Sequence, residues 1–270
     1  LRVLSQLGDR AAGAVIGSWA VDTLLGPGSG AMPVAVFPGG CMGAALWAQV
    51  LEGSPAVLRP LGFYDGMIGT WTCGAIAAWW TRTAIWPVLA ALVVAAPWIQ
   101  GIGRLRCLVQ GCCHGRRAAD DVGIRYTHPR SRVWRVLSLR GVSVHATPLY
   151  SLLWNVVVGL VVARIYLLHA SSAMVGGVYL ILSGAGRFVE EAYRGEPQTP
   201  VLGGLRLYQW VAVATLVLGA FITTIENSAP SPPPALHLFS IFVALACGVV
   251  AWFLTGVDFP ESNRRFARLT

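Results

Sequence analysis

The sequence predicts an all-α fold, a polytopic bundle of seven to eight transmembrane helices with a small extramembrane cap. Of the 270 residues, 55% are hydrophobic and only 12% are charged, whereas ordinary globular domains are roughly 45–50% apolar and about 25% charged. Charge-free apolar runs recur along the chain, and many approach the ~20 residues that a helix needs to cross a bilayer. One globular core would not need so many runs, so we treat residues 1–270 as a single transmembrane domain.

Four apolar spans precede the polar middle of the chain. Asp22 interrupts the first span, and Arg82 separates the third from the fourth. Gly- and Pro-rich segments bound the second span, as expected between helices. The four predicted spans are residues 11–25, 31–51, 66–80 and 83–102.

The polar middle, residues 103–146, is rich in arginine and is predicted to form the cap between helices. All 20 basic residues of the chain are arginine, and nine of them lie between Arg104 and Arg140. The formal net charge of +8 is therefore concentrated in one place and indicates an anionic partner. In a membrane protein this partner is expected to be a phospholipid headgroup of the bilayer, and we predict no nucleic-acid partner.

Apolar spans resume after the cap. The last one follows a proline-rich segment that cannot lie inside a helix. Together with the earlier spans they make seven clear candidates, and the span that Asp22 interrupts is the eighth. The later predicted spans are residues 147–163, 166–186, 207–225 and 236–256.

Residues 103–116, Gly-Arg-Leu-Arg-Cys-Leu-Val-Gln-Gly-Cys-Cys-His-Gly-Arg, place polar side chains among glycines where an apolar span ends. Glycines let the backbone approach a ligand closely, and successive N–H groups can bind a phosphate. The segment is therefore interpreted as an anion site at the membrane surface. A Gly-rich turn with arginines on the positively charged side of the membrane is the alternative.

A second charged group closes the span at 166–186. Arg187, Glu191 and Arg194 recur at i, i+4 and i+7 and therefore share one helix face, while Glu190 is expected to face outward. Ionised groups at the end of an apolar span persist mainly where they face a cavity and a partner. A glutamate between two arginines can hold both guanidinium groups for a phosphodiester. A structural salt bridge at the interface is the alternative.

These two stretches resemble motifs of the prolipoprotein diacylglyceryl transferases, in a variant form with cysteine where other members have asparagine. Residues 145–150, His-Ala-Thr-Pro-Leu-Tyr, and residues 204–209, Gly-Leu-Arg-Leu-Tyr-Gln, are similar to two further motifs of that family, the second with Arg206 in place of serine. The four motifs occur in the family's order from residue 103 to residue 209.

The resemblance implies a membrane transferase in which a thiolate attacks the glyceryl carbon of phosphatidylglycerol or a related anionic phospholipid and expels glycerol phosphate. Arg104 and Arg187 would bind the phosphate and stabilise its growing charge, and Glu191 would orient Arg187. The residues expected to form the rest of the substrate site are Gln110, Gly111, His114, Gly115, Arg116, Arg194 and Gln209.

The sequence departs from the family at the element that supplies a candidate general base. The family's His-Gly-Gly appears here as Tyr64-Asp65-Gly66, so we place Tyr64 and Asp65 among the catalytic candidates. Another base is then needed, and Asp65, His114 and His145 are available. The acceptor stays open: it is a prolipoprotein cysteine or another nucleophile, on a protein or a small molecule.

No cofactor and no metal site are predicted. Cys107, Cys112 and Cys113 lack the paired C-x2-C spacing of zinc sites, and adjacent cysteines do not easily bind one tetrahedral ion. A disulfide from Cys107 to Cys112 or Cys113, or simple packing against the cap, is the simpler interpretation.

Two other functional classes compete with the transferase. One is a non-catalytic phospholipid-binding or scaffold protein of the same fold. The other is a transporter or channel, which is disfavoured because the charges gather at span ends and not at broken helices in mid-membrane.

The location is predicted to be the bacterial plasma membrane, crossed several times. The family resemblance places the arginine site outside the cell. The positive-inside rule, applied to Arg2, Arg10 and the C-terminal arginines, favours the cytoplasm. We favour the outside, because arginines that bind lipid phosphate report topology poorly.

Overall fold

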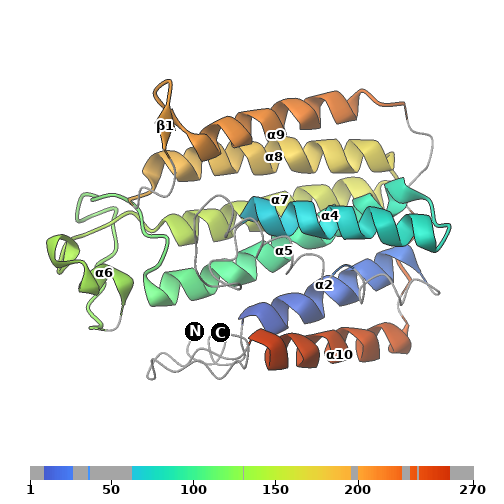
Figure 1. Cartoon of the computed structure of the whole chain (residues 1–270), viewed down its shortest axis with the longest axis horizontal. Helices are drawn as coiled ribbons and strands as arrows, with labels where there is room; N and C mark the ends of the chain where they lie inside the picture. The colour runs from blue at the N-terminus through green and yellow to red at the C-terminus, as the bar shows by residue number, and fades with distance from the viewer. Residues whose placement is uncertain are drawn as a thin grey trace.

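The computed structural model describes residues 9–26, 36, 63–129, 131–195, 200–226, 232–235 and 237–255. Within these ranges the regular structure is almost entirely helical, which confirms the predicted all-α class. Apart from Val36, the predicted span 31–51 falls outside the described part, as do Arg2, the C-terminal arginines and the side chain of Arg10. The elements, labelled as in Figure 1, are α2 (Asp9–Leu25), α4 (Phe63–Trp80), α5 (Ile85–Gln110), α6 (Arg132–Arg135), the 3-10 helix η1 (Leu137–Leu139), α7 (Thr147–Leu167), α8 (Ser172–Tyr193), β1 (Val201–Leu202), β2 (Leu205–Arg206), α9 (Leu207–Thr223) and α10 (Leu238–Thr255).

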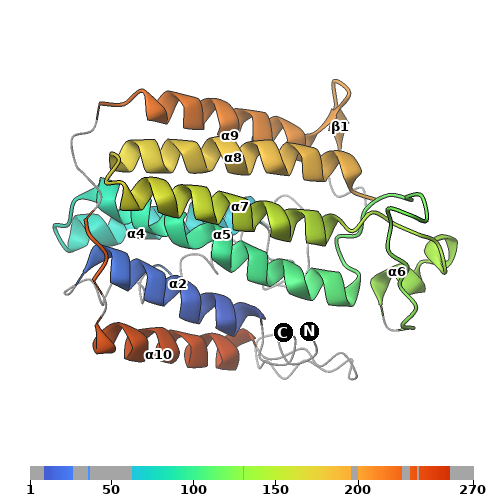
Figure 2. The ribbon, with the colours of Figure 1, turned by 180° about the vertical axis from the view of Figure 1, so that it is seen from behind.

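The long helices lie side by side in a bundle (Figures 1 and 2). Their order across the molecule is α9, α8, α7, α5, α2 and α10, each in contact with the next, and α4 packs against α5. The core between α2, α5, α7 and α8 is apolar and includes the fully buried Tyr166 and Tyr179. Their hydroxyls are satisfied, because Tyr166 donates to the carbonyl of Leu24 and Tyr179 accepts from Gln100, each at 3.0 Å.

The lengths and surfaces of the helices identify a membrane protein. Helices α5, α7 and α8 are long and apolar enough to cross a bilayer, while the apolar parts of α2, α9 and α10 are shorter. Large apolar side chains stay exposed on the outer surface, among them Leu160 of α7, Phe221 of α9 and Phe242 of α10. Such a surface is stable against lipid and not against water. The predicted count of seven to eight crossings stays a prediction.

Several helices extend beyond the predicted spans, and the differences in α5 and α8 matter for the site. The span expected to end at residue 102 continues to Gln110, because residues 104–110 favour helix and Gly111 is the first to adopt the left-handed conformation that ends it, at φ 67°. Residues 103–110 are therefore the last two turns of α5 and not the start of the cap. Helix α8 is shifted relative to the predicted span 166–186. It begins after Ser171, whose hydroxyl accepts from the N–H of Met174, and ends at Tyr193.

The cap segment, residues 111–146, lies at one end of the bundle with α6 and η1 (Figure 1). The first residues of the cap segment are hydrogen-bonded to the end of α8. The N–H of Arg116 donates to the carbonyl of Tyr193 at 2.8 Å, and the N–H of Gly195 donates to the carbonyl of His114 at 3.1 Å. A Cβ on Gly115 would lie 2.5 Å from the Cβ of His145. Glycine at 115 therefore permits this close approach.

A short hairpin, which the sequence did not predict, precedes α9. Strands β1 and β2 are antiparallel, with Leu202 opposite Leu205, and the turn residues Gly203 and Gly204 have φ of 56° and 81°. Two consecutive residues of positive φ are what a two-residue hairpin turn requires. The hairpin lies at the cap end of the bundle and delivers Arg206 to the start of α9.

Candidate functional site

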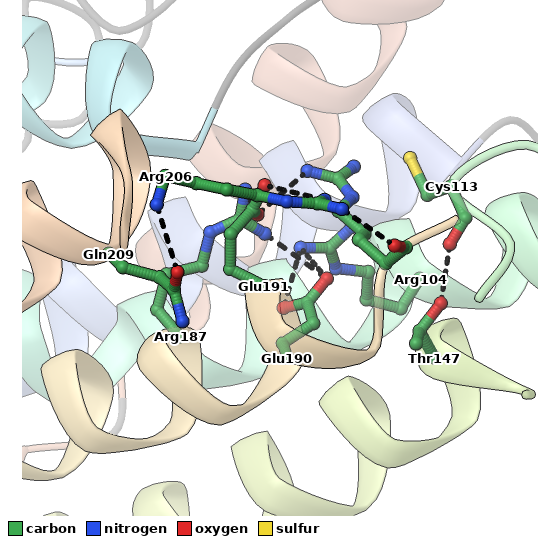
Figure 3. A network of polar contacts seen from close by, with 9 residues as sticks. Arg104, Cys113, Thr147, Arg187, Glu190, Glu191, Arg206 and Gln209 are labelled. Atoms are coloured by element: carbon green, nitrogen blue, oxygen red, sulfur yellow. Dashed lines mark hydrogen bonds and ion pairs between the residues drawn. The ribbon is translucent and has the colours of Figure 1, made fainter. Parts of the chain in front are cut away.

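Six buried or half-buried charged side chains gather at the cap end of the bundle, where α5, α8 and the start of α9 meet (Figure 3). Helices α5 and α8 supply residues on facing sides, and the hairpin adds Arg206, the residue directly before α9. The six residues are Arg104 of α5, Arg187, Glu190 and Glu191 of α8, Arg194 at the end of α8, and Arg206.

Glu190 joins α5 to α8. Its Oε1 lies 3.0 Å from Nη2 of Arg104 and 3.1 Å from Nη1 of Arg187. The residue is only 7% exposed, so the prediction that Glu190 faces outward is wrong. The helix continues past residue 186, and Glu190 lies on the face of its last turns that meets α5, whereas Val189 lies on the exposed face.

Glu191 is the centre of the network. It is fully buried, and its carboxylate lies 3.1 Å from Arg187 Nη2 and 3.4 Å from Arg194 Nη1. The predicted shared face of Arg187, Glu191 and Arg194 is therefore confirmed. Arg206, which sequence reasoning did not include in the site, adds a third guanidinium at 3.6 Å and donates to the carbonyl of Arg194 at 3.2 Å.

The network holds more positive than negative charge. Four arginines and two glutamates leave a surplus of two positive charges among largely buried groups. The Nε atoms of Arg187 and Arg194 are buried and have no hydrogen-bond partner within the described ranges. Burial alone would lower the pKa of Arg194, but Cys113, Glu190 and Glu191 raise it overall, so this guanidinium stays charged. Buried donors without partners are unfavourable unless an anion accepts from them.

Two residues of α9 hold the arginines in place. The ring of Tyr208 lies under Arg187, with 5.4 Å between the guanidinium carbon and the ring centroid. Gln209, predicted to bind substrate, is buried and accepts a hydrogen bond from the backbone N–H of Arg206 at 3.0 Å. In this structure its amide oxygen therefore fixes the start of α9 and the backbone of Arg206.

The other predicted substrate-site residues lie around the network. Gln110 is the last residue of α5, and Gly111 is the buried residue that ends the helix. His114 is buried, with Nδ1 at 3.0 Å from the carbonyl of Gly115, and Gly115 pairs with Arg194 in an isolated bridge. Arg116 is exposed, and its guanidinium carbon lies 5.1 Å from the centroid of the Tyr193 ring.

The predicted bases are in different positions. His145 lies in an aromatic group, with its Nδ1 at 3.3 Å from the hydroxyl of Tyr150 and its ring centroid 5.0 Å from that of Tyr193. This group adjoins the network through Tyr193, the residue before Arg194. Tyr64 and Asp65 belong to the first turn of α4, but their side chains lie outside the described part of the chain. Their catalytic role stays a prediction.

The three cysteines of the first motif come together beside the arginines. The sulfur atoms of Cys107, Cys112 and Cys113 all lie within 4.8 Å of one another, and the thiols are free and half-buried. Hydrogen bonds from the other two thiols lower the pKa of Cys113, and nearby guanidinium groups lower it further, although burial opposes the shift. The disulfide considered from the sequence is thus not formed in this structure.

An apolar cavity of about 430 Å³ lies between α2, α5 and α7. This volume is within the ~300–1,000 Å³ range of small-molecule sites. Its walls include Trp19 of α2, Trp98 and Leu105 of α5, and Val156 of α7. Leu105 follows Arg104 directly in α5, so the cavity extends to the region of α5 that carries the charged network.

The sequence missed two of the six network residues, Glu190 and Arg206. A signal existed for each. Two adjacent glutamates at the end of an apolar span are both unfavourable in lipid, so both needed partners. Arg206 stands where the resembled motif has serine, directly after a Gly-Gly turn and before an apolar helix.

Known proteins similar to this chain belong to the family that its motifs resemble. A family profile described as prolipoprotein diacylglyceryl transferase matches residues 38–225. The chain is 26% identical over 209 residues to a phosphatidylglycerol–prolipoprotein diacylglyceryl transferase of Clostridium tetani, covering 73% of this chain and 80% of that protein. It is 26% identical to transferase 2 of Clostridium perfringens, covering 67% and 70%, and 28% identical to the Mycobacterium tuberculosis transferase, covering 69% and 43%.

Proposed function

This chain belongs to the prolipoprotein diacylglyceryl transferase family, and we propose that it moves the diacylglyceryl group of phosphatidylglycerol to a prolipoprotein cysteine in the bacterial plasma membrane. The names of the clostridial relatives state both the lipid donor and the protein acceptor for those proteins. Four motifs and a match over most of the chain support the same substrates here.

The surplus of positive charge in the network carries the proposal. In the reaction a thiolate attacks the glyceryl carbon, the carbon–oxygen bond breaks, and glycerol phosphate departs with the bonding electrons. The phosphate thereby changes from a singly charged diester to a monoester with a second negative charge. Two surplus guanidinium charges in a buried site match that final charge, and such preorganised groups stabilise charge that develops in the transition state.

The geometry supports distinct roles for the arginines. Arg104 and Arg187 share Glu190 from two helices, so this carboxylate holds their guanidinium groups close enough to engage one phosphate together. The Nε groups of Arg187 and Arg194 remain available as donors. The apolar cavity beside α5 would hold part of an acyl chain while the headgroup reaches the network.

Tyr64 and Asp65, which stand where the family has histidine and glycine, favour one alternative function. Without the usual base the protein would bind phosphatidylglycerol and not turn it over. The charged network would then be a lipid-binding site in a non-catalytic protein of the same fold.

Turnover in vesicles separates the two functions. We expect the purified protein, reconstituted with radiolabelled phosphatidylglycerol and a peptide carrying a lipoprotein-type cysteine, to release glycerol phosphate and to produce a lipid-modified peptide. The same peptide with serine in place of cysteine is the control and should release none. Retention of phosphatidylglycerol by the protein without any release would establish the non-catalytic function.

A further inference from the structure

The cysteine cluster at the edge of the network has the layout of a ligand site. Cys107 lies one turn after Arg104 on α5, and the turn after Gln110 brings Cys112 and Cys113 back beside it. Cys113 has φ of 57°, which is strained for a residue with a side chain, and the Thr147 hydroxyl donates to its carbonyl at 2.6 Å (Figure 3). Strained backbone held by a side-chain hydrogen bond is characteristic of functional positions.

The spacing of the sulfurs fits a common metal ion. In a tetrahedral site with metal–sulfur bonds of about 2.3 Å, the sulfurs are about 3.8 Å apart. The three sulfurs lie within 4.8 Å of one another, about 1 Å more than this distance. The sulfurs of the adjacent Cys112 and Cys113 are both in this group, which answers the objection that adjacent cysteines do not easily share an ion.

The surroundings favour an anionic complex over three neutral thiols. The guanidinium groups of Arg194 and Arg104 both lie near the Cys113 side chain. Three thiolates and one divalent ion carry a net charge of −1, and the excess positive charge of the adjacent network favours such an anion. The hydroxyl of Tyr126, whose ring lies over Gly111, is buried and has no hydrogen-bond partner in the described part of the chain. It is an unsatisfied polar atom beside the cluster.

We propose that Cys107, Cys112 and Cys113 bind one divalent ion of the zinc class, and that its fourth coordination position takes the thiol of the acceptor. Among the described residues the cluster contains only these three ligands of the types that zinc prefers. Three protein ligands with an open position are the arrangement of catalytic zinc sites, whereas structural sites are closed by four. The metal site stands on the cluster itself, and its role toward the acceptor rests on the proposed function.

Binding of the acceptor thiol to the ion would replace the general base that the sequence lacks. The acceptor thiol binds the ion as a thiolate and releases its proton to water, because a coordinating thiol is deprotonated. Its sulfur then attacks the glyceryl carbon, the carbon–sulfur bond forms, and glycerol phosphate departs with the bonding electrons toward Arg104 and Arg187. The product thioether is neutral and leaves the ion. Arg194 lies near Cys113, so the thiolate and the phosphate would meet at one place.

Metal content tests the site directly. The protein is purified under reducing conditions with added Zn²⁺, and bound zinc is measured by elemental mass spectrometry. We expect about one ion per chain, and a large loss of zinc in Cys107→Ser, Cys112→Ser and Cys113→Ser. Cys73→Ser is the matched control, because Cys73 is also half-buried but lies outside the cluster, and it should keep its zinc. Cobalt in place of zinc should give a thiolate-to-metal absorption band that Cys73→Ser retains.

A wild-type preparation without zinc, or one whose cluster carries a disulfide and excludes the metal, would overturn the site. The role at the acceptor is tested on the same wild-type protein after treatment with a chelator. We expect binding of phosphatidylglycerol to persist and peptide modification to fall at least roughly tenfold, restored by Zn²⁺ and not by Mg²⁺. Unchanged modification after complete removal would overturn the role. No lipid transfer to any peptide with zinc bound would instead refute the proposed function and leave the metal site standing.

Discussion

At the scale of single residues, the arrangement of Glu190 and Glu191 decides how the arginines are held. The two are neighbours in sequence but pair with different groups. Glu190 bridges α5 and α8 through Arg104 and Arg187, whereas Glu191 gathers Arg187, Arg194 and Arg206 from α8 and the start of α9. Each carboxylate thus compensates several buried guanidinium groups, so removing its charge leaves more than one of them uncompensated.

Glu191→Gln and Glu190→Gln should therefore both impair lipid transfer, with the larger loss at Glu191. Breaking a buried ion pair by removing one partner costs about 3–5 kcal/mol, and Glu191 is fully buried and pairs with three arginines. Glycerol phosphate release and thermal unfolding in detergent measure the two effects. Asp120→Asn, which removes an exposed partner of Arg125, is the control and should change neither. A fully active Glu191→Gln would contradict the network.

Arg104→Ala and Arg187→Ala should each lower turnover by about 10²–10³-fold, the range seen when one preorganised donor to a developing anion is lost. Lysine at either position should not restore full activity, because a guanidinium can bind a phosphate through two parallel N–H groups and an ammonium cannot. Steady-state turnover of labelled phosphatidylglycerol measures both series, with Arg125→Ala in the exposed cap as the control. Wild-type turnover in either alanine variant would remove that arginine from the phosphate site.

At the scale of helices, the contact between α8 and α9 sets the position of the network. Small residues bring the two backbones close: a Cβ on Gly184 would lie 2.8 Å from the carbonyl oxygen of Ala212, and one on Gly219 would lie 2.7 Å from that of Gly177. Close approach through small residues is the usual mode of helix association in membranes. Because Arg206 and Tyr208 belong to the start of α9, the spacing of these helices also sets their distance from Glu191 and Arg187.

Gly177→Ala and Gly176→Ala form a matched pair that tests this contact. A Cβ at 177 would lie 2.5 Å from Cγ2 of Thr223, whereas a Cβ at 176 meets nothing within 4 Å. The first variant should force the helices apart and therefore lower both the unfolding temperature and the turnover. Such overpacking typically costs about 1–3 kcal/mol of folding stability. The second should leave both nearly unchanged. Equal stability of the two variants in detergent would show that α8 and α9 are not held this closely.

At the scale of the whole molecule, the bundle places several features on one side of the membrane. The start of α2, the end of α10, the cap segment and the hairpin all lie at the same end of the bundle, and the turn between α4 and α5 lies at the other (Figure 1). We therefore expect the site and both terminal helix ends to face the same compartment. The positive-inside rule and the family resemblance therefore make opposite predictions for this whole end of the bundle.

We predict that this compartment is the outside of the cell, because the arginines of the site are held by glutamates and serve a phosphate, so they report topology poorly. Asp121→Cys in the cap and Thr83→Cys in the α4–α5 turn, both at exposed positions, test the orientation. Each substitution is introduced into a variant in which all native cysteines are replaced by serine. Intact cells are then treated with a membrane-impermeant maleimide. Labelling should occur at 121 in intact cells and at 83 only after lysis. The reverse pattern would place the lipid substrate in the cytoplasmic leaflet.

The residues that could be predicted from the sequence are those whose partners lie within two helical turns. Arg187, Glu191 and Arg194 share a face because 3.6 residues make a turn, and no other part of the chain is needed to say so. Arg104 and Glu190 are 86 positions apart, and no periodicity relates them. The bounds of α5 and α8 were predicted poorly for a related reason. Charge ended the predicted spans, yet the charged residues continue the helices because their charges are compensated inside the protein.

The sequence by itself determined that this is an all-α membrane protein whose arginines are concentrated in one segment. Long charge-free runs are stable only in lipid as helices, since every backbone group must be bonded within its own segment. Only the tertiary structure decided that Glu190 is a buried bridge, that Arg206 joins Glu191, and that three thiols converge beside Arg194. These contacts depend on how α8 packs against α5 and α9 and on the cap returning to the end of α8, and such long-range geometry results from packing among all the elements at once.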